Sequence, residues 1–556
     1  MSPSREQPGL TRRSLLGGLA GAGAAGLLAP ATGLASALSD RPSVFSHWVG
    51  ALSGDSGELA APRPFKLVGV EWASPARARI ELRARPRGGV WSPWATASTL
   101  GHGPDRPNAR ALIGDPVWTG PADHVELRSS QPLAGLRLHF VDVSLPGAAS
   151  TAAAAPLAQP RLDAGPGQPP IIARTAWAGG NAPPSVVPGY GTVRLAFVHH
   201  TDSPNSYSSG EVPAMILAMY QFHRFVRGWD DIGYNFVIDL YGRIWEARLG
   251  GIDQAVVGAQ AGGYNLVSTG VAVIGTFNSL IPSAPAISAL EQLLAWKLSL
   301  HGVPALGRVT VQVNPADAFY TPFAPGARVS LPRIAGHRDG DSTDCPGNAF
   351  YPQLPALRPR INTLAGNPAR ITLTAPAKPS AASAPVPVSG RLTDLHGAPI
   401  AGAPVEVQRF SASPSGPRET TVATATTGAD GRWSAAVALK RRALLRALHR
   451  PAPAAVSDLV AIGVPAAITL KLVTASPLKV SGTVRPSTGT VTLELFAVQP
   501  GGHWARLRRR VVTVRHGAFS AVLATSVPGV YGVSAHTAAN TVSAAGVSAP
   551  VEVSIP

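Results

Sequence analysis

The stretch Leu195-Ala196-Phe197-Val198-His199-His200-Thr201 is an apolar run that ends in two histidines. A continuous apolar run of this length is typical of a strand that is buried on both faces, as in the sheets of α/β proteins. A second run, Val271-Ala272-Val273-Ile274, has the same character. Because α/β proteins build their sites at the carboxyl edge of such strands, the histidines stand where a functional site is expected.

Apolar residues recur at helical spacing between and after these two strands. They are Met215, Met219, Phe222 and Val226 in the first stretch and Ile287, Leu290, Leu294 and Leu298 in the second. We interpret Ser288-x-x-Glu291 as a capping box of the second helix. Strands that alternate with helices predict an α/β domain, to which we assign residues 171–362.

The segments on either side of this domain have the composition of β-domains and linkers. Residues 41–148 contain alternating apolar and polar stretches such as 78–84 and 136–141, which predict an N-terminal all-β domain. Residues 149–170 and 363–387 are rich in Ala and Pro, and we predict that both are linkers.

The last part of the chain contains a repeat. Val388-Ser389-Gly390 recurs as Val480-Ser481-Gly482, and the offset is close to the length of an immunoglobulin-like sandwich. We therefore predict two such sandwiches, over residues 388–470 and 471–556. The basic run 440–450 is interpreted as a solvated insertion, with an amphipathic helix on an anionic surface as the less favoured alternative. Arg506 and the three arginines at 508–510 predict an exposed edge strand.

The chain has 556 residues, too many for one compact core, and length alone predicts about three or four domains. Hydrophobic residues make up 45% and charged residues 14%, a balance that excludes disorder throughout. The net charge of +17 favours polyanionic surroundings. We expect no nucleic-acid partner, because the basic residues are scattered over the domains and no nucleic-acid-binding motif accompanies them.

Cys345 is the single cysteine of the chain, so a disulfide within the chain is excluded. It lies eight residues after His337. Imidazole and thiolate are preferred zinc ligands, and two histidines with one cysteine leave a fourth position for water, as in a catalytic site. Taken singly, a histidine at a strand end is more often a hydrogen-bonding residue and a buried cysteine a small hydrophobe. Consecutive strand residues point to opposite faces, so one metal is expected to bind only one of His199 and His200.

Eight short motifs follow one another in order around these residues. They are ARTAW (173–177), VHHT (198–201), DIGYNF (231–236), GRIWEAR (242–248), GYN (263–265), IGTF (274–277), GHRD (336–339) and TDCPG (343–347). Together they resemble the peptidoglycan recognition protein and type 2 N-acetylmuramoyl-L-alanine amidase family over about residues 171–358, roughly a third of the chain. The resemblance implies a mixed β-sheet flanked by helices, with zinc at the base of a groove that holds the peptidoglycan stem peptide.

The resemblance also implies roles for particular residues. The zinc ligands correspond to His199, His337 and Cys345, and the catalytic positions to Tyr234 and Thr343. Members that do not cut typically lack the cysteine, so its presence favours an enzyme over a receptor. The residues expected in the substrate groove are His200, Asn235, Trp245, Arg248, Gln260, Tyr264 and Asn265. His200 is also expected to pack behind the metal site, and Gln260 stands where relatives often carry His.

The predicted function is that of a zinc-dependent hydrolase that cuts the amide bond between N-acetylmuramic acid and L-alanine of peptidoglycan. The alternative is a recognition protein that binds peptidoglycan without cutting it. Tyr234 and Thr343 can donate hydrogen bonds to a developing oxyanion. The general base is open between the zinc water and Glu246, for which a structural ion pair with a neighbouring arginine is the favoured interpretation. The expected partners are the stem peptide and muramic acid, together with anionic wall polymers.

Residues 1–37 resemble a twin-arginine signal peptide. Arg12 and Arg13 precede a Gly/Ala-rich stretch that ends in Ala35-Ser36-Ala37, a small-x-small cleavage site. We therefore expect a secreted or cell-wall-associated protein, with an uncleaved membrane anchor as the alternative. No later run of about eighteen apolar residues predicts a membrane span.

Overall fold

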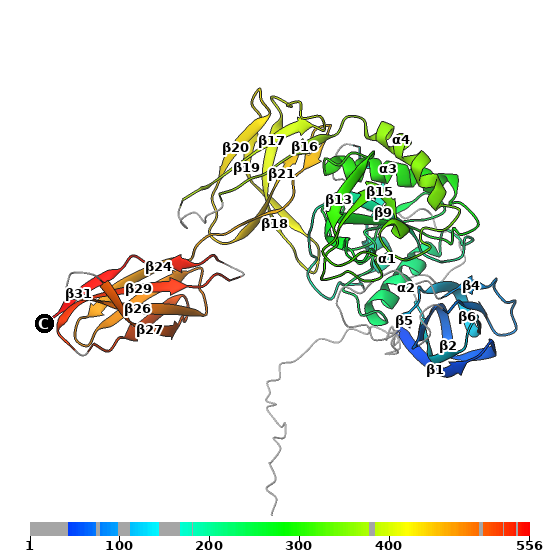
Figure 1. The fold of residues 1–556 in the computed structure, drawn as a ribbon, viewed down its shortest axis with the longest axis horizontal. Helices are drawn as coiled ribbons and strands as arrows, with labels where there is room; N and C mark the ends of the chain where they lie inside the picture. Colours follow the sequence, from blue (N-terminus) through cyan, green and yellow to red (C-terminus); the bar gives the residue numbers. More distant parts are fainter. Residues whose placement is uncertain are drawn as a thin grey trace, which may run out of the picture. The chain divides into compact units, whose positions relative to one another are not determined.

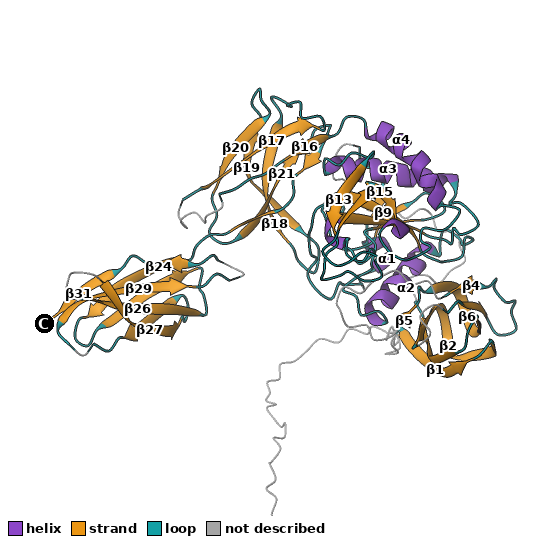
Figure 2. Cartoon of the chain, in the orientation of Figure 1, coloured by secondary structure: helices purple, strands orange, loops and turns teal. Residues whose placement is uncertain are grey.

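A computed structural model describes residues 43–73, 78–97, 112–143, 167–180, 182–376, 384–499, 504–525, 527–540 and 543–556 (Figure 1). The predicted signal, residues 1–37, and most of the predicted linker 149–170 lie outside these residues. Within the described ranges every α-helix belongs to the predicted α/β domain, and the flanking segments are built of strands (Figure 2). None of the described helices combines the length and apolar character needed to cross a membrane.

The N-terminal segment is an all-β domain, as predicted. Its strands are β1 (Val44–Leu52), β2 (Asp55–Trp72), β3 (Ile80–Arg85), β4 (Ala95–Thr96), β5 (Leu112–Ile113), β6 (Val117–Ser129) and β7 (Leu133–Val141). They form one sheet in the order β1-β7-β2-β6-β3-β4, with β5 paired to β2. Apolar side chains alternate along β3 and β7 and pack into a core that includes Phe65, Trp72 and Phe140. This alternation is the signal that predicted the domain.

The central domain contains a six-stranded mixed sheet in the order β15-β9-β12-β10-β11-β8. The strands are β8 (Ile171–Ile172), β9 (Leu195–His200), β10 (Phe236–Ile238), β11 (Ile244–Glu246), β12 (Ser268–Val273) and β15 (Ile334–Gly336). Strands β15, β9, β12 and β10 are parallel, and β11 runs antiparallel to β10. Every residue of β9 and β12 is buried, which confirms the prediction from their continuous apolar runs.

Helices cover both faces of this sheet, which explains why its central strands are buried throughout. The helices are α1 (Thr175–Ala178), α2 (Val212–Phe225), α3 (Ala284–Leu300) and α4 (Leu354–Ala365). Val271 and Val273 pack in one core with α3 and α4, whereas Ala272 packs in a second core with α2. In the register of the parallel pair, His199 lies beside Ala272 and His200 beside Val273. The two histidines therefore belong to opposite faces, as strand geometry predicts.

The start of α3 corrects one sequence prediction. Its N-cap is Ser283, whose Oγ accepts a hydrogen bond from the amide of Ala286 at 3.3 Å. Ser288 lies inside the helix and accepts from Gln292 one turn later, so the capping box predicted at Ser288 is wrong. The serine that caps is the one that precedes Ala284 and Pro285, because proline suits the first turn of a helix, where its missing N–H costs nothing. The remaining elements of the domain are the hairpin β13 (Arg308–Gln312) and β14 (Arg328–Pro332) and the short 3-10 helices η1 (Asn265–Val267), η2 (His337–Asp339) and η3 (Tyr351–Gln353).

Each of the two C-terminal repeats has a three-stranded and a five-stranded sheet around one apolar core. The first contains β16 (Ala369–Ile371), β17 (Val386–Asp394), β18 (Pro404–Ser411), β19 (Arg418–Thr426), β20 (Arg432–Val437), β21 (Ala443–His449), β22 (Ala455–Val456) and β23 (Val460–Ile462). The second contains β24 (Ala467–Thr474), β25 (Lys479–Arg485), β26 (Thr490–Val498), β27 (Trp504–Thr513), β28 (Ala518–Val522), β29 (Gly529–Thr537), β30 (Gly546–Val547) and β31 (Val551–Ile555).

The repeated glycines occupy equivalent places in the two units. Gly390 of β17 pairs with Trp433, and Gly482 of β25 pairs with Phe519. A Cβ atom at either glycine would lie within about 2 Å of a backbone oxygen, 1.8 Å from that of Thr372 and 2.0 Å from that of Thr469. Only glycine permits this close approach of the neighbouring strand, which accounts for the repeat in the sequence.

The structure corrects two further predictions in this part of the chain. The predicted linker 363–387 contains β16, which pairs with β17. The basic run 440–450, interpreted as a solvated insertion or a helix, contains the largely buried strand β21, whereas Lys440, Arg441, Arg442 and Arg450 at its ends are exposed. By contrast, β27 is an exposed edge strand, as its arginines predicted.

Candidate metal centre

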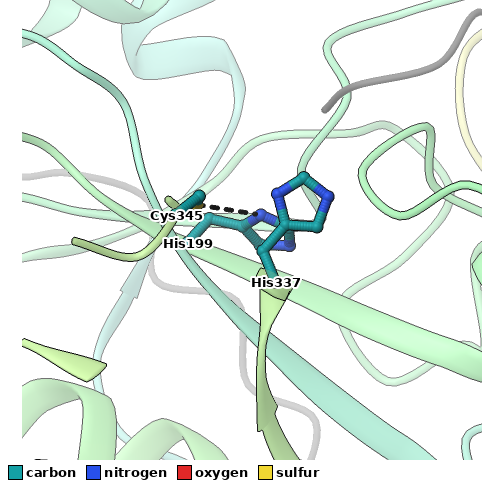
Figure 3. Close-up of side chains that lie close together, drawn as sticks. All are labelled: His199, His337 and Cys345. Atoms are coloured by element: carbon teal, nitrogen blue, oxygen red, sulfur yellow. Dashed lines mark hydrogen bonds between the residues drawn. The ribbon is translucent and has the colours of Figure 1, made fainter. Parts of the chain in front are cut away.

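Three side chains from separate parts of the central domain meet at the carboxyl end of β9 (Figure 3). His199 is the second-last residue of β9, and His337 follows β15, the neighbour of β9 in the sheet. Cys345 lies in the loop after η2. Each residue offers one ligand atom, and these atoms lie within 4.8 Å of one another. All three side chains have no exposed surface.

The spacing of these atoms fits a tetrahedral zinc ion. Zinc lies about 2.0–2.1 Å from an imidazole nitrogen and about 2.3 Å from a thiolate sulfur, so two such ligands at a tetrahedral angle are about 3.6 Å apart. The Sγ atom of Cys345 lies 3.7 Å from Nδ1 of His199. The donor set of two imidazoles and one thiolate is also the set that zinc prefers. The residues present therefore fit the metal that the sequence predicted.

Each histidine of the cluster is held by a buried side chain at its Nε2 atom. Nε2 of His199 lies 2.5 Å from Oε1 of Gln260. Nε2 of His337 lies 3.0 Å from Oδ2 of Asp341, which also accepts a hydrogen bond from the amide of Gly262 at 2.7 Å. Partners of this kind orient metal-binding imidazoles in proteins.

Burial and the neighbouring backbone shift the pKa of the Cys345 thiol in opposite directions. Burial raises the pKa of the Cys345 thiol well above its usual range, and the backbone N–H of His200, which donates to Sγ at 3.3 Å, opposes that shift. Thr343 is half-buried, and its Oγ1 accepts from the amide of Cys345 at 3.2 Å. A cation at the cluster would favour the thiolate, because the thiolate is the form that binds metal.

Tyr234 lies beside the cluster, just before β10. Its ring centroid is 5.3 Å from that of His199, and the side chain is buried. Burial, assisted by the nearby carboxylate of Asp115, raises the pKa of Tyr234 well above its usual value. The phenol therefore stays protonated at neutral pH and can act only as a neutral hydrogen-bond donor or acceptor.

His200 faces away from the cluster, into the core shared with α3. Its Nδ1 accepts from the amide of Phe277 at 3.3 Å, and its Nε2 lies 3.1 Å from Oδ1 of Asp202. The side chain is buried, which agrees with the packing role expected for it.

Six of the seven residues expected in the groove are buried and bond within the domain. They are His200, Asn235, Trp245, Gln260, Tyr264 and Asn265. The amide of Asn235 connects β12 to the segment around Val256, accepting from the N–H of Gly270 at 2.8 Å and donating to the carbonyl of Val256 at 2.9 Å. Trp245 donates to Asp239 at 2.9 Å. Internal partners use these groups in the structure, and the groove contacts expected of these residues stay a prediction. The seventh, Arg248, is half-buried and donates to the carbonyl of Ile232 at 3.2 Å.

Glu246 also has an internal role. Its Oε2 accepts from the backbone N–H of Arg174 at 3.0 Å, while the guanidinium of Arg174 pairs with Asp231 at 2.7 Å. Burial raises the pKa of Glu246, and the charge and N–H of Arg174 oppose the shift. Arg174 thus contacts Glu246 through its backbone N–H, which gives Glu246 a structural contact, and the ion pair expected for Glu246 stays a prediction.

Sequence reasoning did not single out Asp341, although it stands four residues after His337. Nor did it find Ser268, whose Oγ accepts from Nε2 of Gln260 at 2.8 Å. Asp341 could have been found, because a carboxylate close in sequence to a candidate metal-binding histidine is a usable signal. Ser268 has no such signal, because only the fold brings it to Gln260.

Known families match two parts of the chain. The family described as N-acetylmuramoyl-L-alanine amidase matches residues 189–348, which include His199, His337 and Cys345. The family described as Rv3811 N-terminal galactose-binding domain-like matches residues 34–161, where the structure has β1 to β7.

Individual proteins are similar to part of the chain. Peptidoglycan-recognition protein 1 of Holotrichia diomphalia is 32% identical over 160 residues, which make up 27% of this chain and 78% of that protein. The N-acetylmuramoyl-L-alanine amidase of Mus musculus is 29% identical over 157 residues, 28% of this chain and 24% of that protein. The solved structure of wild-type Drosophila PGRP-LB is 26% identical and covers 33% of this chain and 91% of its own, with a TM-score of 0.26. By its central domain, the chain belongs to the family of peptidoglycan-recognition proteins and N-acetylmuramoyl-L-alanine amidases.

Proposed function

We propose that the chain is a zinc-dependent hydrolase that cuts the amide bond between N-acetylmuramic acid and L-alanine of peptidoglycan. One observation carries the proposal: His199, His337 and Cys345 meet with the spacing of zinc ligands inside a domain of the amidase family. The murine relative named as an amidase of this bond supports the same reaction. A bound zinc ion would supply a Lewis acid for the scissile carbonyl and lower the pKa of water toward about 7.

The protein's own residues would complete the chemistry. The phenol of Tyr234 stays protonated and lies beside His199, so it can donate a hydrogen bond to the carbonyl oxygen as negative charge develops there. The hydroxyl of Thr343 accepts from the amide of Cys345, which leaves its own proton free to be donated to substrate. Glu246 is held by Arg174 and supports the fold of this edge of the domain; we assign it no proton transfer.

A recognition protein that binds peptidoglycan without cutting it is the second candidate. The relative from Holotrichia diomphalia carries the name of a peptidoglycan-recognition protein, which supports peptidoglycan as the partner in either case. The chemistry of the cluster favours the enzyme, because a thiolate and two imidazoles leave an open position at zinc.

The remaining assignments are also proposals. The stem peptide and muramic acid are the proposed ligands of the central domain, and the C-terminal repeats are proposed to be immunoglobulin-like sandwiches that position it on the wall. The four arginines of β27 are exposed and are a proposed contact for anionic wall polymers. Export by a twin-arginine-type signal would place the protein outside the cytoplasm, where these partners are.

Digestion of purified peptidoglycan by the full-length protein tests the proposed function. Mass spectrometry should detect free stem peptides, and metal analysis should find about one zinc per chain. Cys345→Ser is expected to lose both zinc and cleavage, and the control His396→Ala, at an exposed turn, is expected to keep both. Cleavage that persists in Cys345→Ser would contradict a zinc–thiolate site. Zinc binding without cleavage by the wild type would support the recognition protein instead.

A further inference from the structure

Gln260 is enclosed within the central domain, and both ends of its amide have partners there. Its side chain has no exposed surface, and its amide lies between His199 and Ser268. The oxygen Oε1 is 2.5 Å from Nε2 of His199, and the nitrogen Nε2 of the amide is 2.8 Å from Oγ of Ser268. The two ends of a glutamine amide have nearly the same shape, so the surrounding hydrogen bonds must decide which end faces the histidine.

Ser268 decides the orientation of this amide. Its hydroxyl donates to the carbonyl oxygen of Tyr264 at 2.9 Å. A carbonyl can only accept, so the single hydroxyl proton of Ser268 is used in that bond, and its oxygen is left to accept from Gln260. The –NH₂ end of the amide therefore faces Ser268, and the oxygen faces His199.

The orientation of the amide in turn sets the proton of the imidazole. Because the amide oxygen can only accept, Nε2 of His199 must carry the hydrogen. A neutral imidazole has one such hydrogen, so Nδ1 carries the lone pair, and Nδ1 is the atom that lies 3.7 Å from Sγ of Cys345. We propose that Gln260 is a positioning residue that holds His199 with its proton on Nε2 and presents Nδ1 to the metal; the proposal rests on the proposed zinc site.

The packing around Gln260 keeps its side chain in this position. A Cβ atom at residue 270 would lie 2.4 Å from Cγ of Gln260, so the glycine of β12 at that position provides the space for the side chain. The backbone N–H of Gln260 donates to Oδ1 of Asn265 at 2.8 Å, which fixes the start of the side chain. Gln260 is thus held by Asn265 of η1 and by Ser268 and Gly270 of β12.

His337 is held differently, by the carboxyl group of Asp341. The partner described at Nε2 of His199 is the neutral amide of Gln260. Residue 260 must therefore offer a hydrogen-bond acceptor that reaches Nε2 of His199, and this acceptor need not carry a charge. A glutamate at 260 keeps the acceptor, whereas a leucine of similar size removes it.

Competition with a zinc chelator measures the consequence in the full-length protein. Loss of a partner behind a metal-binding histidine typically weakens metal binding about 10- to 100-fold, and this loss is expected for Gln260→Leu. Gln260→Glu is expected to bind zinc at least as tightly as the wild type, which makes it the rescue variant. The matched control is Gln254→Leu, a buried glutamine whose amide bonds to Glu419, and it should leave zinc binding unchanged.

The ring ¹⁵N spectrum of metal-free protein labelled at histidine gives a second measurement, with His199→Ala to identify the signals. The wild type should show His199 protonated on Nε2, and Gln260→Leu should show a mixture of the two tautomers. Ser268→Ala, which frees the amide to rotate, should give a mixture as well and serves if Gln260→Leu does not fold. The proposal would be overturned if Gln260→Leu bound zinc as tightly as the wild type does. It would also be overturned if His199 of the wild-type protein carried its proton on Nδ1. Failure of the wild type to bind zinc would refute the proposed function, while the spectrum of the metal-free protein would still test Gln260.

Discussion

The guanidinium of Arg227 lies 2.6 Å from the carboxylate of Asp115, and both side chains are buried. Arg227 follows α2 of the central domain, whereas Asp115 belongs to the N-terminal β-domain. Around this ion pair, Leu67 and Trp118 of the β-domain share an apolar core with residues of α2. The N-terminal domain is therefore packed against the helix that covers the His199 face of the sheet.

Replacing Asp115 should destabilise this contact strongly. In Asp115→Asn the guanidinium of Arg227 stays buried but loses this carboxylate, and breaking a buried pair from one side typically costs about 3–5 kcal/mol. Calorimetry should show a lower unfolding temperature. The control is Asp430→Asn, whose ion pair with Arg432 is exposed and whose loss should cost about 0–1 kcal/mol. Equal effects of the two substitutions would mean that the Asp115 pair adds little to the contact.

A second prediction about the contact between the N-terminal domain and α2 concerns Gly69 of β2. A Cβ atom at this position would lie 2.2 Å from the ring of Phe222, so Gly69→Ala must displace the ring or the strand. Overpacking of this kind typically costs about 1–3 kcal/mol, and Phe222→Leu in the same chain should recover part of the loss. Calorimetry should show a lower unfolding temperature in Gly69→Ala. Gly210→Ala, where a Cβ meets nothing within 4 Å, is the control and should unfold at the wild-type temperature.

The sequence predicted the central strands and the three clustered side chains because both signals are local. The apolar run ending at His199 marks a buried strand, and the spacing of His337 and Cys345 is visible along the chain. The partners of the histidines could not be predicted in the same way, since Gln260 reaches His199 only through the fold.

The buried strand within the run 440–450 was not predicted for a similar reason. Its arginines suggested a solvated surface, but Arg446 is 1% exposed and pairs with Asp253 and Glu419, one from the central domain and one from β19. A charge can be buried when its counterions come from distant parts of the chain, and composition does not show them.

Lys297 should make stability depend on pH. Lys297 lies on α3 and donates to the carbonyl of Ile252. Its burial lowers its pKa to about 7, and the nearby carboxylate of Asp253 opposes the shift. Between pH 7 and about 10.4 the unfolded chain binds a proton that the folded chain lacks, so the free energy of unfolding rises with pH, by up to about 1.4 kcal/mol per unit. The stabilisation is complete above the unfolded pKa and disappears as the pH falls through about 7.

Unfolding temperatures between pH 6 and 9.5 test this linkage. The difference between wild type and Lys297→Met should grow in favour of the wild type as the pH rises above 7. Lys440→Met removes an exposed lysine and should run parallel to the wild type throughout. A constant offset between wild type and Lys297→Met over the whole range would show that Lys297 keeps an ordinary pKa.

Tyr234→Phe should separate catalysis from metal binding. The substitution removes one hydroxyl from a buried ring beside His199 and leaves the three clustered side chains in place. Loss of one donor to a developing oxyanion typically lowers the rate about 10²- to 10³-fold, so kcat for release of stem peptide should fall by that factor while the zinc content stays at the wild-type level. Because burial holds the pKa of Tyr234 well above its usual value, the wild type should show no loss of activity from phenol ionisation up to about pH 10. Tyr531→Phe, in the last domain, is the control and should keep full activity. A kcat for Tyr234→Phe within about threefold of the wild type would assign the oxyanion to Thr343 alone, and Thr343→Val should then carry the whole loss.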